Sequence, residues 1–233
     1  MAKVVMISGG GRGLGAAITR KLLSEKWQVS LGLRDTNQVD AFEAGSDQLL
    51  AVPYDATVEG APDDWVATTV ERFGQVDALV NNAGIFRMVG FSNGSTKDMN
   101  DLWAINVMGP FLLTRAALPE LRKTGAGRIV NIASTDAKRF RPGSSAGYTM
   151  SKHSLLAMTQ AVRAEGWDDG IRATALCPGA IDTDLIAYLP GATPKADRLA
   201  PGTVAEMVNF LLSLPNQASV PELIANTRME GLL

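Results

Sequence analysis

The chain of 233 residues is 46% hydrophobic, enough to bury one substantial core, and its 22 basic and 24 acidic residues leave a net charge of −2. This balance argues against general binding to nucleic acid or to an anionic membrane, and no run approaches the roughly 20 apolar residues of a membrane helix. The sole cysteine, Cys177, excludes an internal disulfide, and the N-terminus has no pattern typical of an export signal. We therefore expect one soluble, cytoplasmic domain over residues 1–233, whose partners are small molecules and copies of itself.

Short apolar runs alternate along the chain with longer segments of helical spacing. This order predicts an α/β protein made of βαβ units, with a parallel sheet covered by helices on both faces. The predicted strands are Lys3–Ser8, Gln28–Leu33, Leu49–Tyr54, Ala78–Val80, Arg128–Ile132, Arg172–Leu176 and Glu222–Asn226. The predicted helices are Gly13–Lys26, Asp63–Phe73, Thr96–Lys123, Ala146–Glu165 and Thr203–Leu212.

Prolines limit three of these elements. Pro110 and Pro119 should bend or interrupt the helix predicted over 96–123, because a proline inside a helix lacks the N–H donor and its ring clashes with the preceding turn. Pro221 fits only the start of a strand or a sheet edge. A glycine- and proline-rich stretch near the C-terminus predicts one long loop, and we expect residues 183–203 to form a lid over the substrate.

A glycine-rich turn connects the first predicted strand to the first predicted helix. Its sequence is Ser8-Gly9-Gly10-Gly11-Arg12-Gly13-Leu14-Gly15. In this position glycines let the backbone approach a pyrophosphate, and the helix N-terminus supplies N–H donors and the positive end of a dipole. Tight strand-to-helix turns also use glycine for structural reasons alone. No Gly-Lys-Ser/Thr follows, so the turn is not a P-loop.

The spacing of Gly9, Gly13 and Gly15 resembles the T-G-x-x-x-G-x-G pattern of the short-chain dehydrogenase/reductase family, with Ser8 in place of threonine. Further markers follow in the family's order over about residues 1–185. They are Asp55, Asn81-Asn82-Ala83-Gly84, Asn106, Ser134, Tyr148-x-x-x-Lys152 and Pro178-Gly179-Ala180-Ile181-Asp182-Thr183. The resemblance implies a Rossmann-like, doubly wound parallel sheet of about seven strands in the order 3-2-1-4-5-6-7, and assembly as a homodimer or homotetramer.

The resemblance also implies a nicotinamide cofactor, with Asp55 and Ala56 at the adenine, Asn82 at its ribose, and Ile181 and Thr183 near the nicotinamide. Either asparagine of the Asn81-Asn82 pair could instead serve only to tie neighbouring strands together. The complete set of expected cofactor residues is Gly9, Gly11, Arg12, Gly13, Leu14, Gly15, Arg34, Asp55, Ala56, Asn82, Ala83, Gly84, Tyr148, Lys152, Pro178, Gly179, Ile181 and Thr183.

The end of the second predicted strand bears on the choice between NADP(H) and NAD(H). An NAD site places a carboxylate there for the adenosine ribose, whereas a 2′-phosphate needs a cation. The position that aligns with the carboxylate is Leu33, Arg34 follows it, and Arg12 is a second cation in the glycine turn. We therefore expect NADP(H). In the alternative, both arginines are surface charges and Asp35 holds an NAD ribose.

Carbonyl reduction by hydride needs a proton donor and a group that stabilises charge on the oxygen. Tyr148 and Lys152 are four residues apart on a predicted helix, so they share one face, and the cation is expected to lower the pKa of the phenol. Ser134, at the end of the fifth predicted strand, is expected to orient the carbonyl, with Thr135 as an alternative. The resemblance implies that Asn106 positions a water that links the lysine to solvent.

The segment between Ser134 and Tyr148 contains three cations, Lys138, Arg139 and Arg141. One or two of them could hold a carboxylate or another anion of the substrate, or the segment could be a solvated basic loop. Phe86, Met88, Tyr188 and Leu189 are expected to form apolar walls of the substrate pocket, or, equally, to be ordinary core or lid packing.

The sequence thus predicts an oxidoreductase that transfers hydride between NADP(H) and a carbonyl or secondary alcohol. A cofactor-sensing protein without turnover is one alternative, although such proteins typically lack the tyrosine or the lysine. An NAD-linked alcohol dehydrogenase of the same fold is another. A sugar-nucleotide epimerase would need a larger C-terminal domain, and a divergent enoyl reductase would separate the tyrosine and lysine further. No histidine pair or cysteine cluster predicts a metal site.

Overall fold

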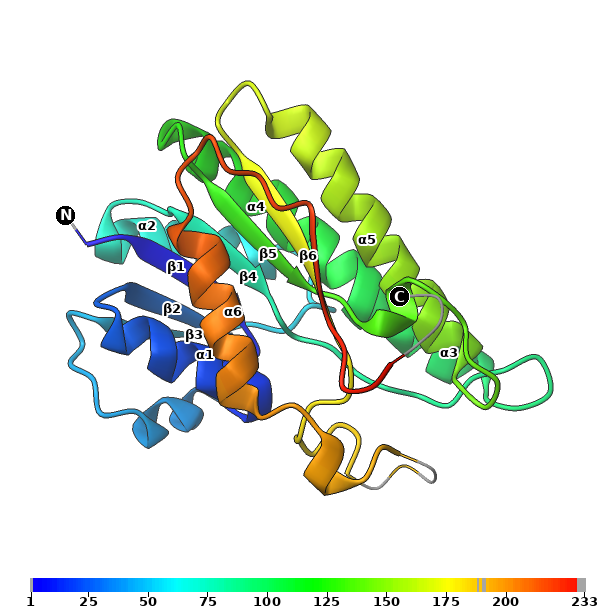
Figure 1. The fold of residues 1–233 in the computed structure, drawn as a ribbon. Helices are drawn as coiled ribbons and strands as arrows, with labels where there is room; N and C mark the ends of the chain where they lie inside the picture. Colours follow the sequence, from blue (N-terminus) through cyan, green and yellow to red (C-terminus); the bar gives the residue numbers. More distant parts are fainter. Residues whose placement is uncertain (1, 188, 190–191, 230–233) are drawn as a thin grey trace.

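The computed structural model describes residues 2–187, 189 and 192–229, and a seven-stranded parallel sheet lies at its centre (Figure 1). The strand order β3-β2-β1-β4-β5-β6-β7 confirms the predicted fold class. Chain order reverses beside β1, and ligands of such sheets bind in the crevice beyond the strand ends at this reversal. The strands are β1 Val4–Ser8, β2 Gln28–Leu33, β3 Leu49–Pro53, β4 Ala78–Asn81, β5 Arg128–Ile132, β6 Arg172–Pro178 and β7 Glu222–Ala225.

Helices cover both faces of the sheet, as predicted (Figure 1). The α-helices are α1 Gly13–Ser24, α2 Ala61–Phe73, α3 Thr96–Trp103, α4 Gly109–Lys123, α5 Ala146–Gly166 and α6 Pro201–Ser213. α1 packs against α6 on one face, and α2 packs against α4 on the other. The core divides in the same way, with one cluster around Ile18 and Val208 and a second around Trp65 and Leu113. All five residues of β1 are buried, which explains its continuous apolar run.

The single helix predicted over 96–123 is divided in the structure. α3 ends at Trp103, a wide π-type turn, η2 (Ala104–Met108), follows, and α4 begins at Gly109. Pro110 explains the break, since it has no N–H for the carbonyl one turn before it. Pro119 was expected to bend or interrupt the helix too, but α4 continues through it to Lys123.

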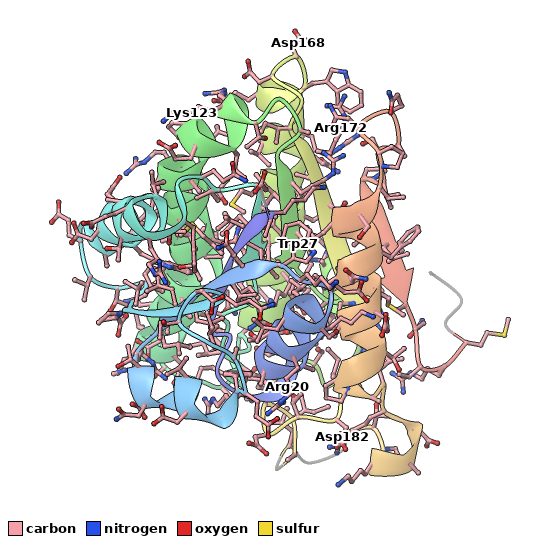
Figure 2. The ribbon with its side chains drawn as sticks, turned by 90° about the vertical axis from the view of Figure 1, so that its left-hand side faces the viewer. Arg20, Trp27, Lys123, Asp168, Arg172 and Asp182 are labelled. Atoms are coloured by element: carbon pink, nitrogen blue, oxygen red, sulfur yellow. The ribbon has the colours of Figure 1, made fainter. Side chains whose placement is uncertain are left out.

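The described residues also form three short 3₁₀ turns, namely η1 (Thr36–Ala41), η3 (Thr135–Ala137) and η4 (Lys195–Asp197). β5 ends at Ile132, as the predicted strand Arg128–Ile132 does, and Ser134 follows it as the N-cap of η3. Arg172, which starts β6, and Asp182, which follows it, lie at opposite ends of the molecule (Figure 2). The end at Asp182 is therefore the carboxyl edge of the sheet. Within the described part of the chain, every helix is too short or too polar to cross a membrane.

Candidate active site

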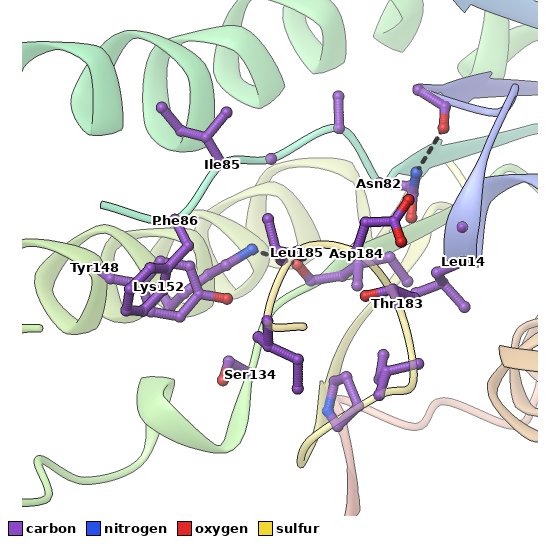
Figure 3. Close-up of a pocket in the computed structure, with 18 of the residues that line it drawn as sticks. Leu14, Asn82, Ile85, Phe86, Ser134, Tyr148, Lys152, Thr183, Asp184 and Leu185 are labelled. Atoms are coloured by element: carbon purple, nitrogen blue, oxygen red, sulfur yellow. Dashed lines mark hydrogen bonds between the residues drawn. The ribbon is translucent and has the colours of Figure 1, made fainter. Parts of the chain in front are cut away.

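The glycine turn is fastened to the end of β4 by side-chain hydrogen bonds. Ser8 Oγ accepts from the backbone N–H groups of Asn82 and Ala83, both at 3.1 Å. Asn82 Nδ2 donates to the carbonyl oxygens of Ser8 and Gly9 at 3.0 and 3.1 Å (Figure 3). A Cβ on Gly15 would overlap the carbonyl oxygen of Gly9. The serine that replaces the family's threonine thus joins two strand ends, and glycine is required where α1 meets the turn.

The other asparagine of the pair also ties structural elements together. Asn81 Nδ2 donates to Asn131 Oδ1 of β5 at 2.8 Å and to Thr114 Oγ1 of α4 at 3.0 Å, and all three residues are buried. Asn82 also joins two strand ends through its hydrogen bonds to Ser8 and Gly9, and in addition it lines a cavity.

One large cavity, of about 1240 Å³, runs along the carboxyl edge of the sheet. It is lined by nearly all the residues that the sequence assigned to the site: Gly9, Arg12, Gly13, Leu14, Gly15, Arg34, Asp55, Ala56, Asn82, Ala83, Gly84, Ser134, Tyr148, Lys152, Pro178, Gly179, Ile181 and Thr183. Gly11 and Asn106 do not line it; Gly11 packs against the Gln38 side chain, and Asn106 is buried behind the wall. The N-cap residue of α1 is Arg12, whose side chain accepts no hydrogen bond from the backbone N–H groups of the first turn. The first N–H groups of α1 therefore suit an anion such as a pyrophosphate.

The end of β2 presents both a cation, Arg34, and a carboxylate, Asp35, to this cavity. Arg12 and Arg34 are both exposed on the cavity wall. Asp35 Oδ1 accepts from the backbone N–H of Asn37 at 3.1 Å and so caps η1. Asp55 Oδ1 accepts from the backbone and hydroxyl of Thr57, and these hydrogen bonds, together with the charge of Arg34, lower the pKa of the Asp55 carboxyl.

Tyr148 lies near the start of α5, where Ser145 Oγ accepts from its backbone N–H at 3.1 Å. Its ring is 5.0 Å from that of Phe86, centroid to centroid. Burial raises the pKa of the phenol, the Asp136 carboxylate raises it further, and a hydrogen bond with Ser134 opposes them. The expected lowering of this pKa by Lys152 is wrong for this structure. Tyr148 is consequently a neutral phenol at neutral pH, the form that donates a proton.

Lys152 lies one turn further along the same face of α5 and is buried. Its Nζ donates to the carbonyl oxygen of Ile132, at the end of β5, at 2.8 Å, and lies 5.6 Å from the centroid of the Tyr148 ring. Burial lowers the pKa of Lys152 to about 8, with a smaller opposing effect of Cys177. Ser134, Tyr148 and Lys152 surround one space at the end of the cavity away from Leu14 (Figure 3).

Asn106 supports this space from behind. Inside η2 its side chain accepts from the backbone N–H of Ile85 at 2.9 Å and donates to the Ile85 carbonyl at 3.0 Å. It also donates to Ser151 Oγ at 3.1 Å, and that hydroxyl donates to the Tyr148 carbonyl at 2.7 Å. The wide turn therefore lets Asn106 hold a cavity-lining segment against α5.

The three cations between Ser134 and Tyr148 differ from one another. Lys138 Nζ is 2.6 Å from Glu222 Oε2, and Arg139 Nη1 is 2.6 Å from Asp136 Oδ1 inside the protein. The interpretation of the segment as a solvated basic loop is wrong for these two residues, because each pairs with a carboxylate. Arg141 lines the cavity with part of its side chain exposed.

Several cavity residues have no counterpart in the sequence prediction. Asp136 directly affects Tyr148, and its position two residues after Ser134 was the available signal. Gln38 of η1 lines the cavity near Arg34, and no sequence pattern marks it. The C-terminal segment adds Asn226, Thr227 and Arg228.

The segment expected to form a lid, residues 183–203, leaves the end of β6 and comes back beside it at Leu199. Ile181 and Leu199 form a parallel bridge, and Arg198 Nε donates to the Thr193 carbonyl at 2.8 Å. The expected pocket residues Phe86, Met88 and Leu189 line the cavity, and the expected Tyr188 lies outside the described residues.

The fold and the cavity at its strand reversal define an α/β protein of the Rossmann-like, nucleotide-binding class. The family model for short chain dehydrogenases matches residues 3–192, so the chain belongs to this family. It is 36% identical to an agropine synthesis reductase of Rhizobium rhizogenes over 94% of its own length, but it spans only 51% of that relative.

Solved structures agree in fold over nearly the whole chain. An alcohol dehydrogenase from Thermococcus sibiricus, complexed with 5-hydroxy-NADP, has a TM-score of 0.87 and 29% identity over 96% of both chains. A 3-ketoacyl-(acyl-carrier-protein) reductase from Brucella melitensis, complexed with NADH, has a TM-score of 0.88 and 30% identity over 97% of both.

Proposed function

We propose that this protein is an NADP(H)-dependent oxidoreductase that interconverts a carbonyl compound and a secondary alcohol. The observation that carries the proposal is the single cavity that joins the glycine turn to Tyr148, Ser134 and Lys152. A bound nicotinamide would supply or accept the hydride. The chain would supply the proton, the orientation of the substrate and the exclusion of water.

The roles of the three side chains follow from their protonation and contacts. The neutral Tyr148 hydroxyl would donate its proton to the oxygen of the carbonyl being reduced and take it back in the reverse direction. Ser134, which is hydrogen-bonded to Tyr148, would hold that oxygen in place. Thr135 is the weaker candidate, because its hydroxyl already accepts from Arg139 at 3.3 Å.

Lys152 would hold the cofactor ribose and stabilise the phenolate that forms when the proton leaves Tyr148. Its ammonium group has three hydrogens, and only the bond to Ile132 is present among the described residues, so donors remain for a ribose hydroxyl. Asn106 would hold Tyr148 and Lys152 in position through its hydrogen bonds to Ile85 and Ser151.

The preference for NADP(H) over NAD(H) is part of the proposal. Arg34 and Arg12 would bind the 2′-phosphate, whereas one oxygen of the Asp35 carboxylate caps η1. The cofactor in one structural neighbour is a derivative of NADP and in another NADH. Residues 183–203 would cover the substrate, since their described part lines the cavity at Leu185, Ile186 and Leu189.

The test is to follow cofactor absorbance with NADPH and NADH while screening ketones, aldehydes and oxo acids. Tyr148→Phe should lower kcat by about 10²- to 10⁴-fold, because it removes the proton donor. Cofactor affinity, measured by fluorescence titration, should change less than about twofold, because the phenol is remote from the phosphate turn. Tight cofactor binding without turnover of any compound would favour a sensor, and near-normal rates in the variant would refute the role of Tyr148.

A further inference from the structure

Arg141 carries a charge that no described carboxylate fully compensates. Its nearest acidic atom is Asp136 Oδ1, 3.5 Å from Nε, but this carboxylate already holds Arg139 at 2.6 Å. Asp136 and Arg139 are both less than a tenth exposed, so they form a buried pair of their own. Arg139 and Arg141 therefore share this carboxylate, and Arg141 is the more distant and the more exposed of the two.

The guanidinium group is also incompletely hydrogen-bonded. Nε of Arg141 is shielded from solvent and has no acceptor among the described residues. The side chain as a whole is 41% exposed, and it lines the same cavity as Tyr148. Nε itself is out of reach of a ligand, so the part of Arg141 that would bind one is its exposed remainder on the cavity wall.

Arg141 lies on the side of the cavity where the proton donor is. Asp136, its neighbour, donates its backbone N–H to Ser134 Oγ at 3.0 Å. The same carboxylate is close enough to Tyr148 to raise the pKa of the phenol. Arg141 is therefore linked through Asp136 to both Ser134 and Tyr148, the two side chains proposed to face the carbonyl.

Of the described carboxylates on the cavity wall, only Asp136 lies within ion-pair distance of Arg141. Asp101 is bound by Lys97 at 2.7 Å. Asp184 lies beside Thr183, towards Leu14 and the glycine turn (Figure 3). Among the described residues, Arg141 therefore has as its carboxylate contact only Asp136, which it shares with Arg139.

We propose that Arg141 binds an anionic group of the substrate, and that the substrates of this enzyme are small oxo acids and the matching hydroxy acids. This inference rests on the proposed hydride transfer and assigns its substrate class. A carboxylate fits because arginine donates two parallel N–H bonds to its two oxygens, which fixes the carbonyl relative to Tyr148.

The experiment compares acids with their uncharged esters. Acetoacetate and longer 3-oxo acids, each paired with its methyl ester, are titrated calorimetrically onto protein saturated with the oxidised cofactor. The wild type should bind each acid more tightly than its ester. Arg141→Gln should weaken the acid by about 10- to 100-fold and the ester less than about twofold, with Arg141→Lys in between.

Arg87 provides a matched control. It lines the same cavity with a similarly exposed side chain, 43%, but it pairs with Asp98 at 3.5 Å and donates to the Phe86 carbonyl at 2.9 Å. Arg87→Gln should therefore change the preference for acid over ester by less than about twofold.

Reduction by NADPH and NADH, measured on the same preparations, separates the two proposals. If acids and esters are reduced equally well and Arg141→Gln affects them equally, hydride transfer stands and the anion site is refuted. If the acid binds through Arg141 and neither compound is reduced, the anion site stands and the proposed function is refuted. Failure of every acid to bind, or equal binding of acid and ester, also overturns the role of Arg141.

Discussion

Replacement of Lys152 by methionine should abolish activity and stabilise the protein. The pKa of this buried lysine is about 8, against an ordinary value of 10.5. That difference costs the folded state about 3 kcal/mol at pH 7, since one pKa unit corresponds to ~1.4 kcal/mol. The Nζ hydrogen bond to Ile132, worth about 1 kcal/mol, is lost in the variant. The net gain in free energy of unfolding is about 1 to 2 kcal/mol at pH 7.

The pH dependence of stability tests separately whether Lys152 destabilises the folded protein at pH 7. Between about pH 8 and pH 10.5 the unfolded chain keeps its Lys152 proton while the folded protein has lost it. The unfolded state then binds more protons, so the free energy of unfolding rises with pH in this window. From pH 7 to 10 the rise from Lys152 is about 2.5 kcal/mol. Cys177, whose pKa burial raises to about 11, acts in the opposite direction in both proteins. Lys152 is the last and smallest cause of that pKa, so most of the Cys177 effect cancels in the difference between the two proteins.

The assay is urea unfolding of the wild type and of Lys152→Met at several pH values from 7 to 10. The stability advantage of the variant should shrink by about 2.5 kcal/mol and change sign over this range. Lys123→Met is the control, because the Lys123 side chain is 68% exposed in a surface pair with Glu120, and it should leave the pH dependence unchanged. Equal pH slopes in wild type and Lys152→Met, or a less stable variant at pH 7, would refute the reasoning.

Two further substitutions test the cofactor site and the core. Arg34→Asp should shift the ratio of kcat/KM for NADPH over NADH by about 10- to 100-fold towards NADH, because a carboxylate repels a 2′-phosphate; an unchanged ratio would mean that β2 presents another residue to the ribose. Trp65→Phe should lower the free energy of unfolding by about 2 kcal/mol, because the fully buried indole donates to Ser30 Oγ at 2.9 Å; a loss below about 0.5 kcal/mol in urea unfolding would contradict this account of the core.

Protonation in the site follows from burial more than from the spacing of the two residues on the helix. The four-residue spacing of Tyr148 and Lys152 places them on one face, as expected, yet the phenol is raised in pKa and the ammonium lowered. Both shifts have burial as their largest cause. The carboxylate of Asp136, held by Arg139, adds to the first. Under the proposed function, the proton would therefore come from a neutral phenol.

The sequence by itself determined the fold and most of the cavity. Parallel strands buried on both faces appear as continuous apolar runs, and glycines at fixed positions mark where the backbone must turn tightly. Both are local signals. For this reason the strand order and nearly all the expected cofactor residues on the cavity wall agree with the structure.

Tertiary structure alone decided how the charged residues pair and which of them remain available. Lys138 pairs with Glu222, 84 positions away in the sequence. The buried Asp136 lies 2.6 Å from Arg139 but 3.5 Å from Arg141. The same applies to Asn106, which does not line the cavity, because η2 turns it towards Ile85 and Ser151. Such outcomes depend on distances between segments remote in the chain and on the exclusion of water around them, and neither quantity is written in a local pattern of residues.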